Sequence, residues 1–130
     1  MIIEHCDYIA QKVLEHKAEF SLVVVYDNLI QEFSDDLPLF GIDVDESNSI
    51  EKNVMDEKYK LLGLAVFSLE GDLSTKRAVA VEATENLREF IEGIRLNART
   101  RYDVDVTYGY DTMGGMNVMV AQFTITVNTN

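Results

Sequence analysis

The sequence predicts an α+β domain in which a mostly antiparallel β-sheet packs against two α-helices. Three observations favour this class. Two segments carry apolar residues at helical spacing, several others alternate as strands do, and the chain closes on two alternating segments around a Gly-Gly turn. A length of 130 residues, 47% of them apolar, favours one domain over residues 1–130 with a shared core.

The first predicted element is an amphipathic helix over residues 2–14. Its apolar positions recur at steps of three and four residues, and polar residues fall on the other side. A β-branched run at residues 22–26 then predicts a short buried strand, which ends at the turn signal Asp27-Asn28. Residues 29–33 fit either a helix or a strand.

The middle of the chain predicts two strands and a long connection. Pro38, the only proline, suits the first position of a strand, because apolar residues alternate with glycine or aspartate after it. Residues 45–57 are polar and acidic without a sustained period, which is typical of a connection. Residues 59–69 are apolar on both alternating sets, so we expect a strand covered on both faces.

A second helix and a C-terminal β-hairpin complete the predicted fold. Asp72 or Ser74 can cap this helix, the longest element, and its apolar stripe runs from Leu73 to Ile94. Residues 102–110 alternate clearly, and the Gly114-Gly115 pair supplies the positive φ angles of a tight reversal. The returning strand alternates from residue 119 to residue 127.

The outward side of this last strand is unusually apolar for a strand at a sheet edge. It includes Val118 and Val120 beside Gln122, Thr124 and Thr126. Because exposed apolar patches mark interaction sites, we expect a partner to cover it.

The chain is strongly acidic, with 11 Lys and Arg against 23 Asp and Glu and a formal net charge of −12. Residues 27–57 hold ten carboxylates and one lysine, so this window carries −9 of that charge. Such a surface repels phosphate backbones, which argues against sequence-specific DNA binding. No basic leader precedes an apolar run, and no stretch approaches the roughly 20 apolar residues of a membrane span. We expect a soluble protein that is not exported and has no membrane partner.

The thiol and the two histidines are the first candidates for chemistry. Cys6, the only cysteine, permits no internal disulfide and lies on the apolar stripe of the first helix, so we expect it to pack in the core. His5 and His16 stand about 16 Å apart at a helical rise of 1.5 Å per residue and cannot chelate one metal unaided. We interpret them as ordinary surface or boundary histidines.

A partial calcium motif occurs in the acidic window. Asp43-x-Asp45-x-Ser47 begins like a calcium loop, but Asn48 replaces the glycine of the sharp turn and Val54 replaces the bidentate glutamate. The better interpretation is a solvated acidic loop, with a weak cation site left open.

The remaining glycines and arginines have simple structural interpretations. We interpret Gly109 and the Gly114-Gly115 pair as turn glycines, because no helix start or Lys-Ser/Thr follows them to make a phosphate cradle. Three arginines cluster where the second helix ends: Arg95, Arg99 and Arg101. They suit the negative end of the helix dipole, and contact with an acidic partner stays open. No serine or carboxylate pair stands out, so we expect no catalytic residues, cofactor or bound metal.

With its elements placed in order, the chain resembles the tail terminator (minor tail, tail-completion) proteins of long-tailed bacteriophages. The likeness covers nearly the whole length and includes the opening helix, the Pro-led strand at residues 37–42, the acidic connection and the second helix. Its most suggestive parts are residues 109–111 before the turn and residues 123–127 near the end of the chain.

The resemblance implies a structural virion protein rather than an enzyme. Such a protein assembles into a ring, commonly a hexamer, that caps the tail tube protein and offers a surface to the head-completion (connector) proteins. DNA passes through the channel without specific binding, which suits a negatively charged lining. The implied location is the virion tail, after assembly in the host cytoplasm.

Other classes stay open from the residues alone. A head–tail joining (neck) protein has a related fold. An acidic DNA-mimicking binding module would use the window at residues 27–57 as its recognition surface. An enzyme would need a convergent pocket with perturbed carboxylates or histidines.

Overall fold

The computed structural model describes residues 2–30, 33, 36–45 and 58–129. In chain order these residues form α1 (Ile2–Glu15), the short 3₁₀ helix η1 (Lys17–Phe20), β1 (Val24–Tyr26), β2 (Leu39–Val44), β3 (Lys58–Ser68), α2 (Leu73–Gly93), β4 (Thr100–Met113) and β5 (Met116–Thr129). The architecture is α+β with a C-terminal strand pair, which confirms the predicted class.

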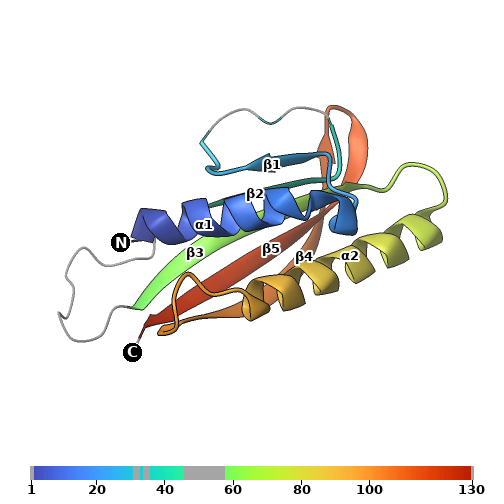
Figure 1. Cartoon of the computed structure of the whole chain (residues 1–130). Helices are drawn as coiled ribbons and strands as arrows, with labels where there is room; N and C mark the ends of the chain where they lie inside the picture. The colour runs from blue at the N-terminus through green and yellow to red at the C-terminus, as the bar shows by residue number, and fades with distance from the viewer. Residues whose placement is uncertain (1, 31–32, 34–35, 46–57, 130) are drawn as a thin grey trace.

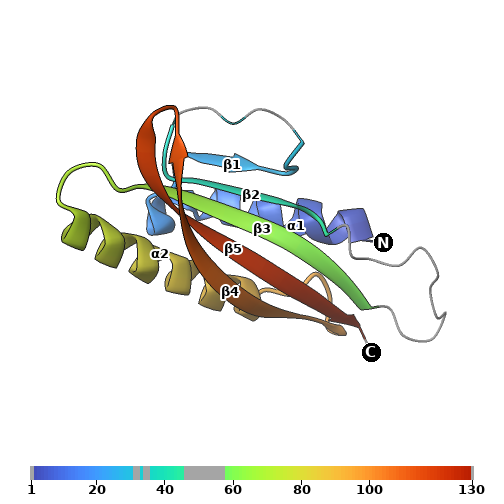
Figure 2. The same ribbon diagram turned by 180° about the vertical axis from the view of Figure 1, so that it is seen from behind.

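The described strands form one sheet in the order β1-β2-β3-β5-β4. β1 pairs with β2 in parallel, and every other neighbouring pair is antiparallel. Both α-helices cover the same face of this sheet, with α1 over the β1 and β2 side and α2 over the β4 and β5 side (Figure 1). Figure 2 shows the opposite face, which no described helix covers.

The main core lies between the two helices and the sheet. α1 buries Cys6, Ile9, Ala10 and Val13, and α2 buries Ala80, Thr84, Leu87 and Ile91. These positions follow the three- and four-residue steps of a helix face. At the centre of the sheet the Phe40 and Phe123 rings meet edge to face with centroids 5.7 Å apart. The apolar periodicity of the sequence therefore identified most of the residues that each helix buries, although it missed His5 and Thr84.

The first two turns of α2 extend beyond this core. Every residue from Leu73 to Val79 is exposed, and Ala80 is the first buried one. Leu73 itself is 52% exposed, so its assignment to the apolar stripe is wrong. The reason is visible in Figure 2, where the far half of the β4–β5 hairpin curves away from the start of α2.

The places of β1 and β5 in the sheet differ from the sequence predictions. β1 is an edge strand of three half-buried residues rather than a buried strand. β5 is an inner strand between β3 and β4, and Val118 on it is only 2% exposed. Val118 packs with Leu39 and Val66 in a second apolar cluster, which the half-buried Val120 joins. The expectation of an exposed apolar edge is therefore wrong for Val118, because β5 is an inner strand and the chain covers this residue, whereas Val120 stays half-buried.

Other local predictions agree with the structure. Gly114 and Gly115 have φ angles of 57° and 79° and make the reversal between β4 and β5. Pro38 directly precedes β2, as a strand-opening proline should. Of the acidic connection predicted at residues 45–57, only Asp45 lies within the described residues.

Candidate functional site

His5 lies in the core rather than at the surface. It is 3% exposed, and its Nδ1 forms a 2.9 Å hydrogen bond with the hydroxyl of buried Tyr102 on β4. Its ring also contacts Tyr59, with centroids 6.2 Å apart. The interpretation of His5 as a surface or boundary histidine is therefore wrong. Tyr102, a partner 97 residues away in the sequence, makes its burial possible.

Cys6 and His16 do not join His5 in a reactive cluster. Burial, with smaller contributions from Asp43 and Asp7, raises the pKa of the Cys6 thiol from 9.0 to about 12. Because the thiolate is the nucleophile, this thiol is a packing group, as the sequence predicted. His16 follows the end of α1, where its Nδ1 lies 3.0 Å from Oε2 of Glu19 and its ring contacts Phe90.

The partial calcium motif has a structural role at its first residue. Asp43 Oδ2 accepts a 2.9 Å hydrogen bond from the amide of Leu29, and Oδ1 accepts one of 2.7 Å from the amide of Val44. Ser47, Asn48 and Val54 of the motif lie outside the described residues. Within the part of the chain that the structure describes, no three His, Cys, Asp or Glu side chains are placed to hold a metal ion.

The predicted turn glycines and arginine cluster need partial correction. Gly109 lies inside β4 rather than in a turn, and nothing stands within 4 Å of where its Cβ would be. Arg95, Arg99 and Arg101 are exposed beyond the end of α2 at Gly93. Their guanidinium groups form no ion pair with any described residue.

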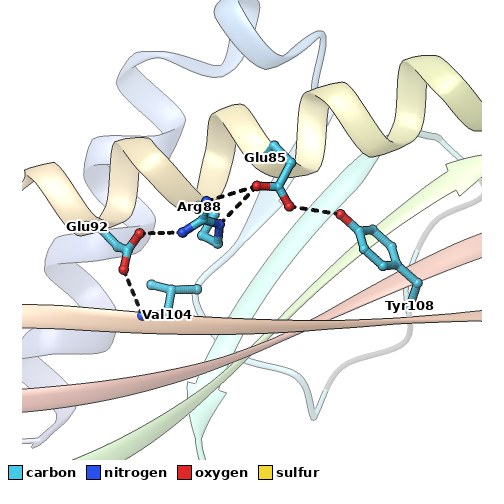
Figure 3. A network of polar contacts seen from close by, with 5 residues as sticks. All are labelled: Glu85, Arg88, Glu92, Val104 and Tyr108. Carbon is cyan, nitrogen blue, oxygen red and sulfur yellow. Dashed lines mark hydrogen bonds and ion pairs between the residues drawn. The ribbon is translucent and has the colours of Figure 1, made fainter.

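A polar network joins α2 to the edge strand β4 (Figure 3). Arg88 donates to Oε2 of Glu85 at 3.1 and 3.0 Å and to Oε1 of Glu92 at 2.7 Å. Glu92 Oε2 accepts from the amide of Val104 at 3.4 Å, and the Tyr108 hydroxyl donates to Oε1 of Glu85 at 3.2 Å. Burial and the charge of Glu85 raise the pKa of Tyr108. The network fixes the spacing of helix and strand and covers one outward amide of the edge.

Beyond this network α2 and the hairpin leave apolar side chains exposed. Tyr110 on β4 is 64% exposed, and Leu73 and Val79 are also exposed at the start of α2. A groove of about 360 Å³ lies between these elements. Its lining is mostly apolar and comprises Leu69, Leu73, Arg77, Tyr110, Asp111, Asn117 and Val118. We call it the α2–hairpin groove.

The α2–hairpin groove also has cations beside it. Arg77 lies one helical turn after Leu73 and therefore on the same side of α2. Lys76 is its neighbour, and α2 carries no acidic residue before Glu82. Neither cation forms an ion pair with a described residue. The first turns of α2 thus carry two cations and no acidic residue, although Glu70 and Asp72 lie just before the helix.

A second exposed feature follows β1, and we call residues 27–30 the post-β1 turn. The Asn28 side chain accepts a 3.3 Å hydrogen bond from the amide of Ile30, and Asp43 holds the amide of Leu29. Leu29 Cδ2 comes within 2.7 Å of where a Cβ would stand on Gly41, so a larger residue there would make the end of the Leu29 side chain shift. Ile30 is nonetheless 90% exposed. The turn therefore presents an isoleucine to solvent on an anchored backbone.

Two further grooves flank the post-β1 turn. One of about 410 Å³ lies between α1 and β1 and includes Asp7, Leu14 and Asp27 in its lining. The other, of about 290 Å³, includes Asp43, Asp45 and Leu62. Both are acidic and contain no described lysine or arginine, so this end of the molecule differs in charge from the start of α2.

The sequence matches no protein-family model and no curated protein. Neither described α-helix is long and apolar enough to cross a membrane. The two exposed surfaces, the α2–hairpin groove and the post-β1 turn, together make up the candidate functional site.

Sequence patterns alone miss both surfaces. They place Leu73 on the apolar stripe of the second helix, although Lys76 and Arg77 interrupt that stripe between Leu73 and Ala80. That interruption is the signal that could have revealed an exposed helix start. Ile30 has no comparable signal in the sequence.

Proposed function

We propose that this protein is a phage tail terminator, a structural protein that forms a ring on the end of the tail tube. The observation that carries the proposal is the pair of unlike surfaces, the α2–hairpin groove and the post-β1 turn. Figure 1 supports their separation, because α2 begins at one end of the sheet and β1 ends toward the other. Contacts between unlike surfaces are head-to-tail, and such contacts close into rings when their rotation divides the circle.

The charge of the chain is consistent with a channel through which DNA moves. A net charge of −12 disfavours contacts with phosphates, since binding of that kind depends on lysine and arginine. In this proposal the ring has six copies, stops growth of the tube protein and contacts the connector proteins of the head. It performs no chemistry and needs no cofactor.

The first test is the mass and shape of the purified protein. Light scattering at high protein concentration should give a ring mass, about 88 kDa for six chains of 14.7 kDa, and negative-stain images should show a central channel. A monomer that persists in moderate salt with the tail tube protein present would overturn the proposal.

The second test separates a terminator from a head–tail joining protein. Adding the ring to polymerising tail tube protein should shorten the tubes and leave a cap at one end. A ring that leaves tube length unchanged but binds the connector would support the joining role. A monomer that binds a basic nucleic-acid-binding enzyme tightly would instead support the acidic DNA-mimicking module, which the −9 window favours.

A further inference from the structure

We infer that the α2–hairpin groove of one copy receives the Ile30 side chain of the next copy, while Asp27 of that copy pairs with Arg77. This contact would join successive subunits of the ring, so the inference rests on the proposed function. It commits the groove to one occupant, a second copy of this chain.

The post-β1 turn has the properties of a preorganised anchor. Ile30 is 90% exposed, yet the turn behind it is held by Asn28, by Asp43 and by the packing of Leu29 over Gly41. An anchor that is already ordered loses little conformational entropy on binding. The backbone that presents Ile30 is therefore held before binding.

The groove offers a complementary surface for such a side chain. Leu69 and Val118 are buried residues within its lining, and the more exposed Leu73 and Tyr110 also contribute. A well-packed apolar or aromatic pocket with a polar surround is the usual form of an interface hot spot. An inserted isoleucine would remove apolar surface of both copies from water.

Arg77 in the groove lining offers a charge partner for the acidic turn of a second copy. Asp27 lies three residues before Ile30, whereas Lys76 and Arg77 lie beside the groove. Glu70, Asp72 and Asp111 also lie near the groove and keep their charge, but none of them forms an ion pair with Lys76 or Arg77. The two cations remain available to a carboxylate from outside.

One copy does not fill its own groove. The start of α2 and the end of β1 lie at opposite ends of the sheet, as Figures 1 and 2 both show. The groove and the turn are also different surfaces, so their contact repeats from copy to copy rather than stopping at a symmetric dimer.

Cysteine pairing tests the contact directly. Ile30→Cys and Leu73→Cys are made in separate proteins, each retaining the buried Cys6, and are mixed under mild oxidation. A covalent dimer should form in the mixture and in neither protein alone. Val79→Cys is the matched control for Leu73→Cys, because Val79 is similarly exposed on α2 but does not line the groove.

A charge exchange tests the pairing of Asp27 with Arg77. Arg77→Glu and Asp27→Arg should each weaken assembly, whereas an equimolar mixture should restore rings of alternating copies. Ile30→Ser should raise the dissociation constant by about thirtyfold, equivalent to about 2 kcal/mol at 1.4 kcal/mol per factor of ten. Ile3→Ser changes an exposed isoleucine of α1 instead and should leave assembly unchanged.

The outcomes distinguish this inference from the proposed function. Suppose that rings cap tubes, tolerate Arg77→Glu and give no covalent dimer when the Ile30→Cys and Leu73→Cys proteins are mixed. That result would overturn the docking contact and leave the terminator intact. Copies that cross-link specifically but never cap tubes would support the contact and overturn the terminator. Monomers under all conditions would overturn both.

Discussion

The buried contact between His5 and Tyr102 should contribute measurably to folding. Tyr102→Phe removes the hydroxyl that lies 2.9 Å from Nδ1 of His5 and leaves that ring nitrogen without this partner. His5→Leu removes the other side of the contact and leaves the Tyr102 hydroxyl in the core. Because both residues are almost completely buried, water cannot easily replace the lost partner.

The expected magnitudes follow from the cost of an unsatisfied buried group. Each single substitution should lower the free energy of unfolding by about 1–3 kcal/mol. The double variant removes both polar groups, so its loss should be smaller than the sum of the single losses by about 1–2 kcal/mol. The free energy of unfolding of a domain of this size is about 5–15 kcal/mol, so each variant should still fold.

Urea denaturation followed by circular dichroism measures all four proteins of this cycle. The dependence of the unfolding free energy on urea should stay constant, since a change would indicate an altered denatured state. Tyr110→Phe is the matched control. Because Tyr110 is 64% exposed, this substitution should change the free energy of unfolding by no more than about 0.5 kcal/mol. Strict additivity of Tyr102→Phe and His5→Leu would refute the reasoning.

Three other substitutions test separate parts of the structure. Burial raises the pKa of the Cys6 thiol to about 12, so the contribution of this thiol to folding stability is complete below pH 9 and is lost as the pH rises toward 12. Cys6→Ala should therefore flatten the pH dependence of the unfolding free energy in that range. Gly41→Ala places a Cβ 2.7 Å from Leu29 Cδ2, the end of a half-buried side chain that can shift, so urea denaturation should show a loss of about 1 kcal/mol, the low end for overpacking. Gly109→Ala, in open space, should cause no such loss. Arg88→Gln removes the ion pairs with Glu85 and Glu92 and should lower the urea midpoint, and high salt should reduce this difference. An equal effect at all salt concentrations would show that the loss does not come from these ion pairs.

The elements that depend on local sequence were largely predictable. α1 and α2 follow from apolar residues at three- and four-residue steps, and the hairpin reversal follows from two glycines with positive φ angles. Pro38 marked the start of β2 for an equally local reason. In each case the signal and the structure that it specifies lie within a few residues of one another.

Strand order and the exposed surfaces depend on distant residues. β5 is covered on both edges because it pairs with β3 and β4, and alternation within β5 carries no information on that pairing. Val118 is buried by Leu39 and Val66, which come from two other strands. The α2–hairpin groove likewise combines residues from before α2, from α2 and from both hairpin strands. No single segment of the sequence contains enough of that groove to predict it.

The balance of charge and apolar exposure explains how such a surface can be specific. With −12 on each copy, most random encounters between copies are repulsive, which keeps an exposed Ile30 and an open groove from associating indiscriminately. At the start of α2, Lys76 and Arg77 form no ion pair with a described residue, although Glu70 and Asp72 lie just before the helix. In the proposed contact, Asp27 of an approaching copy reaches Arg77 only when its acidic turn faces that helix start. The apolar contact then adds affinity in the orientation that charge has selected.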